Sequence, residues 1–296
     1  MLKNSVLIFV MLSALSGAAA AADQELGNLL TSRYRDQVLA LRHSFNARSQ
    51  EYNSDGTPLT KGSEGSWTVY GRIGVKKVSV GADLLQIEGD RVVFESDGPG
   101  KPLQPVRERE RIRITIRLNH AVASEDEAVA VLGRVFALTP QDVVDSAPRL
   151  WRAYLAKQLD VPSGPKNDAT RDAAARDKPA SDGKTGVEIV RDNAGHEKVF
   201  KLGKEITAPK PQFTPEPEYS DVARKLRFQG MLGLNCVIDN TGRVRGIAIA
   251  KPLGLGLDEK AADAVGTWRF APGKLDGQPV TVAMYIEVDF RLYDRR

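Results

Sequence analysis

Cysteine and histidine, two side chains often used for catalysis, are scarce in this 296-residue chain. It holds one cysteine, Cys236, and three histidines, His43, His120 and His196, which lie in separate segments. Cys236 falls on the apolar face of an expected strand, where a thiol packs as a small hydrophobic group. None of the histidines has a metal-binding spacing such as HExxH. We therefore expect no enzyme, no metal site and no cofactor, and one cysteine allows no intramolecular disulfide.

The densest run of charged residues is ERERIRITIR, from Glu108 to Arg117. Its arginines could bind phosphate groups or anionic lipid. Alternation with isoleucine is also typical of a strand that has one solvated face, which is the interpretation we favour. The formal charge of +4 is spread along the chain, so nucleic acid is not an expected partner. The alternating residues are Arg111, Arg113 and Arg117 against Ile112, Ile114 and Ile116.

Gly254 and Gly256 form a G-x-G sequence ahead of an expected helix. A phosphate-binding loop of this type would need a preceding strand and more glycines. We interpret the segment as a loop that leads to Asp258, the expected N-cap of the helix.

The clearest structural pattern is TVAMYIEVDFRL, residues 281–292. Every even-numbered residue from Val282 to Leu292 is apolar, which predicts a strand with one buried face. As the last strand, it is expected at a sheet edge, where unpaired backbone groups can accept a further peptide strand.

The residues before this strand predict the rest of a small α+β unit. A helix is expected over residues 217–229, then a strand with its apolar face at Leu232, Leu234, Cys236 and Ile238. Asp239 to Gly242 predicts a tight turn, and Gly246 predicts a bulge in the return strand. A second helix should carry Ala261, Val265 and Trp268 on one face. Asp276-Gly277 should turn the chain into the last strand.

These elements resemble the TonB C-terminal domain family over residues about 199–293. The resemblance rests on the order and spacing of several short motifs, and it implies a two-helix, three-stranded antiparallel domain. The matching motifs are Tyr219-x-x-x-Ala223 before Gly230, Asp239-x-x-Gly242-x-Val244, Leu257-Asp258-x-x-Ala261, Trp268-x-Phe270-x-Pro272, Gly277-x-Pro279-Val280 and the final alternating strand.

The resemblance also implies a periplasmic role, in which a TonB-dependent outer-membrane transporter or another envelope protein supplies a peptide that adds to the sheet. The energy-transducing members commonly have a neutral amide at the position of Glu216, so their choice of transporter does not carry over. The partner-binding residues implied for this chain are Glu216, Pro217 and Tyr219 ahead of the first helix, and Val282, Met284 and Ile286 in the last strand.

The N-terminus predicts export. Lys3, an apolar run from Val6 to Leu15 and small residues up to Ala22 have the arrangement of a signal peptide over residues 1–22. The protein is then periplasmic. If the segment stays uncleaved, it would anchor the chain in the inner membrane, and only in that case is membrane contact expected.

Residues 24–159 predict an N-terminal α+β domain of unknown function. The expected order is a helix over 26–45, four or five strands, and two helices that begin near Ser124 and Thr139. Within it, residues 67–80 predict strands broken at Gly71 and Gly74, and Gly89-Asp90 predicts a tight hairpin. Residues 160–186 lack apolar periodicity and predict a flexible linker to a C-terminal domain over 187–296.

Two functions fit this organisation. In the first, the C-terminal domain binds peptides of a transporter or another envelope protein by strand addition, in support of TonB-dependent transport. In the second, the protein is a structural or ligand-binding envelope protein that forms a homodimer through its edge strands and transduces no energy.

Overall fold

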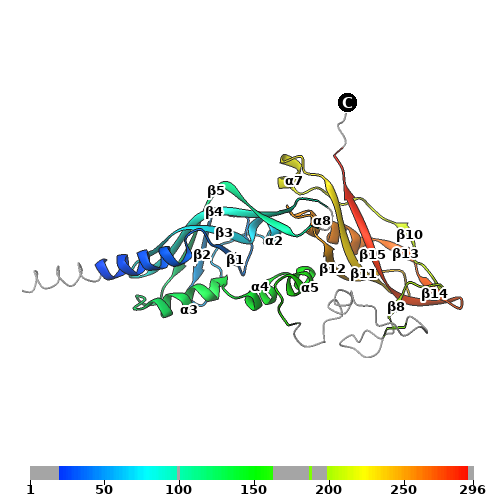
Figure 1. The fold of residues 1–296 in the computed structure, drawn as a ribbon, viewed down its shortest axis with the longest axis horizontal. Helices are drawn as coiled ribbons and strands as arrows, with labels where there is room; N and C mark the ends of the chain where they lie inside the picture. The colour runs from blue at the N-terminus through cyan, green and yellow to red at the C-terminus, as the bar shows by residue number, and fades with distance from the viewer. Residues whose placement is uncertain (1–19, 99–100, 163–186, 189–198, 293–296) are drawn as a thin grey trace, which may run out of the picture. The chain divides into compact units, whose positions relative to one another are not determined.

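The computed structural model describes residues 20–98, 101–162, 187–188 and 199–292 of this α+β protein (Figure 1). The expected signal peptide lies outside these residues except for 20–22, and most of the expected linker lies outside them as well. In the part of the chain that is described, no helix is both long and apolar enough to cross a membrane.

The chain forms two compact units, and both are discontinuous in sequence. Unit 1 takes in the described residues up to 65, together with 70–93 and 107–138. Unit 2 takes in 66–69, 94–106 and the described residues from 139 onward. This grouping differs from the expected domain bounds, because 139–162 and two short earlier segments join the C-terminal part.

Unit 1 is built on a six-stranded sheet with the order β2-β5-β4-β3-β1-β6. A helix over residues 20–34 and α3 contribute to the same core as the sheet, while the opposite face carries charged side chains. The elements are β1 (Val38–Leu41), β2 (Ser49–Asn53), β3 (Arg72–Val80), β4 (Leu84–Ser96), β5 (Leu103–Arg117), α3 (Glu125–Val135) and β6 (Phe136–Ala137).

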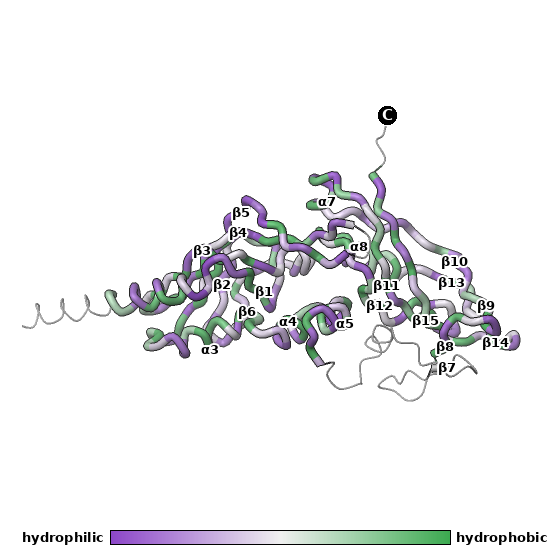
Figure 2. The backbone as a smooth tube through the Cα atoms, in the orientation of Figure 1, coloured by the Kyte–Doolittle hydropathy of each residue, from purple (hydrophilic) through white to green (hydrophobic). Residues whose placement is uncertain are grey.

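The alternation of arginine and isoleucine in β5 has the predicted consequence. Ile112, Ile114 and Ile116 are buried in the core of unit 1, and the intervening arginines are exposed. Figure 2 shows the arginine- and glutamate-rich part of β5 as a hydrophilic stretch of the chain.

Three expectations for the first half of the chain are wrong. The helix expected over 26–45 ends at residue 34, and Val38 and Leu41 belong to β1. Trp67–Tyr70 is a short helix, α2, and β3 then runs unbroken through Gly74. The hairpin expected at Gly89-Asp90 does not form, because β4 is one continuous strand.

Gly89 was expected in a hairpin turn, but it lies where β4 approaches β3 closely. A Cβ atom at this residue would lie 2.2 Å from the carbonyl oxygen of Gly74 in β3. Glycine is therefore required for the close approach of two paired strands, and not for a turn.

The helices that follow unit 1's sheet are only partly as expected. Ser124 caps α3 by accepting a hydrogen bond from the backbone N–H of Glu127, in line with the predicted capping sequence. The helix expected from Thr139 to residue 159 is two helices, α4 (Pro140–Ser146) and α5 (Arg149–Gln158). Pro148 separates them, since proline cannot continue an α-helix without a clash.

Three antiparallel strands in the order β12-β11-β15 form the main part of the sheet of unit 2, with β12 at one edge, and four short strands extend the sheet beyond β15. The central strands and the helices beside them are α7 (Asp221–Lys225), β11 (Gly230–Ile238), β12 (Val244–Lys251), α8 (Leu257–Thr267) and β15 (Gln278–Phe290). The four short strands of this sheet are β7 (Val187–Glu188), β8 (Val199–Lys201), β9 (Ile206–Thr207) and β14 (Gly273–Leu275). A separate two-stranded sheet is formed by β10 (Lys210–Phe213) and β13 (Arg269–Ala271).

Local sequence signals correctly predicted the β11–β12 hairpin. Leu232, Leu234, Cys236 and Ile238 are buried on one face of β11. The Asp239 carboxylate holds the turn by accepting hydrogen bonds from the backbone N–H groups of Thr241 and Arg243. The register between β11 and β12 shifts beside the predicted bulge at Gly246.

The two predicted helices of unit 2 are shorter than expected. α7 covers only five residues, and Leu226 beyond it is 52% exposed. α8 buries Ala261 and Val265 as predicted, but Trp268 is its C-cap and not part of the helix. The N-cap is Gly256, because the Asp258 carboxylate turns back to accept the N–H groups of Leu253 and Gly254.

The loop from Leu253 to Leu257 joins early and late parts of the chain within unit 2. Its carbonyl at Leu253 accepts the N–H of Ser96 at 3.0 Å, and its N–H at Leu255 donates to the carbonyl of Phe94 at 2.8 Å. The Glu259 carboxylate, at the start of α8, accepts the indole N–H of Trp151 in α5 at 3.0 Å. The G-x-G segment therefore connects β12 to α8 and packs against the end of β4.

Candidate functional site

The last strand, β15, has the alternation that the sequence predicts. Val282, Ile286, Val288 and Phe290 are buried on the core face of the sheet, and Met284 is partly buried. The intervening Tyr285, Glu287 and Asp289 are exposed. The apolar side chains are therefore committed to the core, and the part of this strand that a partner can reach is its backbone.

One side of β15 has no partner strand along much of its length. β11 pairs with β15 from Val282 to Phe290. Since β8 pairs in parallel with Thr281 to Ala283, it must lie on the side opposite β11. From Met284 to Phe290, no strand in the described part of the chain pairs with that opposite side. This unpaired side is about 20 Å long at the usual rise of a strand.

The segment ahead of α7 is fixed against the end of β15. The Tyr219 ring meets the Phe290 ring edge-on, with centroids 5.2 Å apart. The Trp268 indole N–H donates to the carbonyl of Pro215 at 3.0 Å. The Ser220 hydroxyl caps α7 by accepting the N–H of Ala223 and donates to the carbonyl of Leu255. These contacts give the segment a defined place at the C-terminal end of the last strand.

A cleft of about 360 Å³ lies where this segment meets β15. The predicted site residues Glu216, Pro217 and Tyr219 line it together, which brings half of the predicted set into one place. The other predicted residues, Val282, Met284 and Ile286, do not line it, and Val282 pairs with strands on both sides. The remaining lining comes from Asp289, Phe290 and Arg291.

The sequence did not predict these last three cleft residues. Phe290 is visible in the sequence only as one more apolar residue of the alternating strand. Its role depends on which end of β15 faces Tyr219, and that register is set by contacts between segments far apart in sequence. The one signal in the sequence was the presence of two aromatic residues, Tyr219 and Phe290, since aromatic rings often pack in pairs.

The polar groups of the cleft are unevenly satisfied. The Arg291 guanidinium pairs with the Asp289 carboxylate at 2.6 Å. The Tyr219 hydroxyl is buried and has no hydrogen-bond partner among the described residues. Burial first, and then the negative charge of Asp289, raises the pKa of Tyr219, so the phenol stays protonated and able to donate. A ligand that accepts this hydrogen bond would remove the cost of an unsatisfied buried group.

The outward face of β15 carries a small cluster around Tyr285. Its ring covers Gly233 of β11, where a Cβ atom would lie 2.0 Å from the tyrosine oxygen. The ammonium of Lys251 lies 5.3 Å from the ring centroid, and the Tyr285 hydroxyl donates to Glu287 at 3.3 Å. These contacts hold the exposed side chains of β15 over the neighbouring strands β11 and β12.

The residues considered first for chemistry lie elsewhere. Cys236 is fully buried in β11, and burial raises its pKa to about 12, so a thiolate is not available. His43 pairs with Glu64 at 2.9 Å, and His196 lies outside the described residues. No group of three or more potential metal ligands occurs among the described residues.

Comparison with known proteins identifies the C-terminal part. Residues 215–292 match the family of the Gram-negative bacterial TonB protein C-terminal domain. This segment is a TonB C-terminal domain. The solution structure of the TonB C-terminal domain of Pseudomonas aeruginosa is similar, at 20% sequence identity over 32% of this chain and 96% of that one, with a TM-score of 0.25. No curated protein matches the chain.

Proposed function

We propose that this chain is a periplasmic protein whose TonB C-terminal domain binds a peptide segment of an outer-membrane transporter, or of another envelope protein, by β-strand addition. The observation that carries the proposal is the unpaired side of β15 from Met284 to Phe290. Exposed N–H and C=O groups along such an edge pair readily with an extended peptide. Family membership of residues 215–292 supports the assignment to the cell envelope.

The predicted partner-binding residues take different roles in this proposal. Met284 and Ile286 offer backbone groups, whereas Val282 is already paired on both sides and only supports the strand. Glu216, Pro217 and Tyr219 line the cleft at the end of the strand, where a side chain of the bound peptide would fit. Backbone pairing gives affinity and the cleft gives selectivity, and no covalent step is required.

Disulfide trapping tests the proposal in the full chain. Glu287→Cys places a thiol on the exposed face of β15, beside its unpaired side. The probe is a synthetic peptide from the periplasmic N-terminal segment of a TonB-dependent transporter, with one cysteine moved along it. Strand addition in one register puts a single peptide residue about 5 Å from residue 287, so one peptide position should cross-link strongly. Its immediate neighbours point to the other face, and residues two positions away lie too far along the strand to be bridged. Buried Cys236 should not interfere, since its pKa is about 12.

Asp263→Cys on α8 is the control, because this residue is exposed but lies in a helix, which offers no strand edge to a peptide. It should show no preference for one peptide position. A peptide with N-methylated backbone amides should lose binding to the unmodified protein, since methylation removes the donors that strand pairing needs. Absence of cross-links, or cross-links spread evenly along the peptide, would contradict the proposal. If the Glu287→Cys variant forms a disulfide-linked homodimer whose yield does not change when peptide is added, self-association would be favoured instead.

A further inference from the structure

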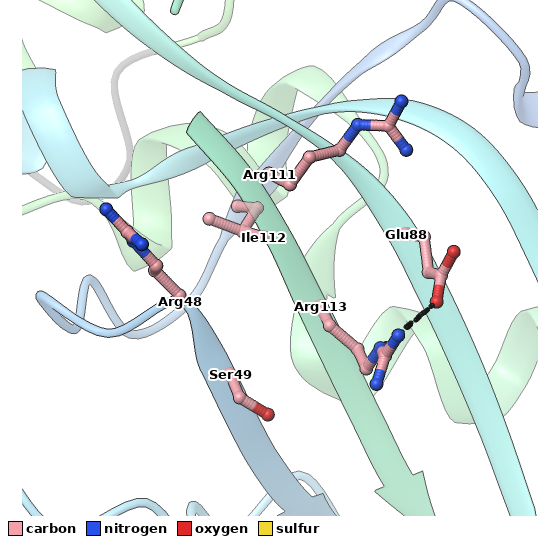
Figure 3. Close-up of a pocket in the computed structure, with 6 residues that line it drawn as sticks. All are labelled: Arg48, Ser49, Glu88, Arg111, Ile112 and Arg113. Carbon is pink, nitrogen blue, oxygen red and sulfur yellow. Dashed lines mark hydrogen bonds and ion pairs between the residues drawn. The ribbon is translucent and has the colours of Figure 1, made fainter. Parts of the chain in front are cut away.

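A second cleft, of about 340 Å³, lies in unit 1 at the start of β2 and beside β5 (Figure 3). Three arginines line it, Arg48 ahead of β2 and Arg111 and Arg113 in β5. Glu88 of β4 supplies the only carboxylate of the lining, and Ser49 and Ile112 complete it. The side chains of the three arginines are 81%, 71% and 56% exposed in that order, so an incoming molecule can reach their guanidinium groups.

The carboxylates around this cleft are shared among more cations than they can neutralise. Glu110 pairs with both Arg48, at 3.0 Å, and the buried Arg91. Asp90 pairs with Lys76 and, at 3.5 Å, with Arg111. Glu88 pairs with Arg113 at 2.8 Å. Five cations therefore share three carboxylates, and the cluster carries a net charge of +2.

The excess positive charge lies on Arg48 and Arg111, whose side chains are the most exposed of the cluster. Arg91 donates to Glu110 from a side chain that is 3% exposed, so this pair is fixed, and Arg48 reaches the same carboxylate from solvent. Burial opposes ionisation of Glu110, but hydrogen bonds from Arg91 and Arg48 outweigh it and lower its pKa, so its charge is permanent at neutral pH. Asp90 is likewise engaged by Lys76, which leaves Arg111 with one long contact.

From this cluster we infer that the cleft binds a phosphate group. Guanidinium groups present planar pairs of N–H donors that match phosphate oxygens, and they do so best where no carboxylate neutralises them. A phosphate dianion balances the net charge of +2. The Ser49 hydroxyl, which is exposed in the lining, can donate a further hydrogen bond. The size of the cleft suits a free phosphate, a phosphomonoester or a phospholipid headgroup.

Arg117 provides a matched control on the same strand and the same face. It pairs with Glu51 at 2.8 Å, its side chain is 63% exposed, and it does not line the cleft. If anions were attracted to the arginines of β5 in general, replacing Arg117 would weaken anion binding as much as replacing Arg111. If the cleft is a defined site, only the replacement of Arg111 should weaken binding.

The test is isothermal titration of the full chain with inorganic phosphate and with pyrophosphate. Arg111→Gln should weaken binding about tenfold or more, because it removes a charge-assisted hydrogen bond. Arg117→Gln should leave affinity within about twofold of the unmodified chain. Glu88→Gln should strengthen binding several-fold, since it releases Arg113 and removes the only negative charge of the lining. Far-ultraviolet circular dichroism of each variant checks that the fold is retained.

Competition by vesicles identifies the source of the phosphate. Displacement of bound phosphate by phosphatidylglycerol vesicles, but not by phosphatidylcholine vesicles, would support the site and assign it to an anionic headgroup. Phosphate binding without displacement would support the site and assign it to a soluble phosphate compound. The inference fails if the full chain shows no heat with millimolar phosphate, or if Arg117→Gln weakens binding as much as Arg111→Gln. It does not depend on the peptide-binding proposal.

Discussion

At the scale of single residues, the hydroxyl of Tyr219 is a candidate hydrogen-bond donor to a bound peptide. It is buried without a hydrogen-bond partner in the described part of the chain, in the cleft beside Phe290. Most buried polar groups in folded proteins are hydrogen-bonded, because an unsatisfied one lowers stability. Such a group is retained at a cost in the free protein, which a bound ligand can offset.

Tyr219→Phe separates the effect of this hydroxyl on stability from its effect on peptide affinity. The free energy of unfolding should stay the same or rise by up to about 1 kcal/mol, since the unsatisfied group is gone. Affinity for the transporter peptide should fall several-fold, as one hydrogen bond of the complex is lost. Urea unfolding and peptide titration measure the two changes. Tyr34→Phe, whose ring lies in unit 1 and outside the cleft, serves as the control for affinity. A loss of stability in Tyr219→Phe would contradict the prediction.

Two adjacent carboxyl groups lie at the start of α8, Asp258 buried and Glu259 partly buried. Asp258 accepts two backbone N–H groups of the preceding loop, and Glu259 accepts the indole N–H of Trp151. Burial first, and then repulsion by Glu259, raises the pKa of Asp258 to about 8. Burial likewise raises the pKa of Glu259. In the unfolded chain both groups titrate near pH 4.

The pH dependence of stability follows from these raised pKa values. The folded protein binds a proton more tightly than the unfolded chain, so this contribution is complete below about pH 4 and is lost as the pH rises through about 8. The unfolding free energy should fall by at least about 1 kcal/mol between pH 5 and pH 8. Asp258→Asn should be less stable at pH 5 but should show a smaller slope in urea unfolding. An unchanged slope would show that this pair does not titrate in that range.

At the scale of elements, sequence patterns predicted what local side-chain spacing determines. The alternation of β11 and β15, the Asp239 turn and the capped start of α3 all follow from neighbours within a few residues. The proline at 148 was also a local signal, and it should have divided the helix expected from Thr139. Gly89 could not be interpreted from sequence alone, because a turn and a close strand contact both favour glycine.

The candidate site was predictable only in part for the same reason. Glu216, Pro217 and Tyr219 follow from the family resemblance and do meet the last strand. The part of β15 that they meet, around Phe290, depends on tertiary register. The pairing of β8 with Thr281 to Ala283 was not predictable either, because short strands carry little periodicity.

A helix side chain completes the edge of β3 where β1 ends. Within β3, only Arg72 to Gly74 pair with β1. Farther along, the Thr31 hydroxyl accepts the N–H of Val78 and donates to its carbonyl, each at 2.9 Å. One buried hydroxyl therefore satisfies two backbone groups that a neighbouring strand would otherwise bind.

Thr31→Val should lower the free energy of unfolding by about 2 kcal/mol, because a side chain of similar shape leaves both backbone groups of Val78 unsatisfied. Thr31→Ser keeps the hydroxyl and should retain most of the stability. Urea unfolding of both variants makes the comparison. Equal stability of the valine and serine variants would mean that water or another group replaces the hydroxyl.

At the scale of the whole molecule, the TonB C-terminal domain belongs to a larger compact unit. Phe94 and Ser96 bond to the loop at Leu253 and Leu255, and Trp151 bonds to Glu259. A Cβ atom at Gly254 would lie 2.1 Å from the carbonyl oxygen of Phe94, and the residue has a φ of +91°, so only glycine fits there. The family segment and these earlier residues therefore pack as one body within unit 2.

A fragment of residues 187–296 should be less stable than the same residues in the full chain. Without Phe94 and Thr68, the N–H groups of Leu255 and Gly256 lose their acceptors. Hydrogen exchange at these two amides should be at least about tenfold faster in the fragment, while amides at the centre of β11 stay comparatively protected. Mass spectrometry of the exchanged peptides measures this. Equal protection in fragment and full chain would show that the earlier segments contribute little.

The hydrogen bond from Thr68 to Glu259 spans 191 residues of sequence. During translation Thr68 is synthesised long before Glu259. Until the later residues are made, Trp67 and Phe94 lack some of the neighbours that they have in the folded protein. Contacts of such long range slow folding, because closing a long loop costs entropy before any contact repays it. Synthesis of this protein therefore includes an interval in which apolar groups are open to misassembly, and a holding chaperone would raise its yield.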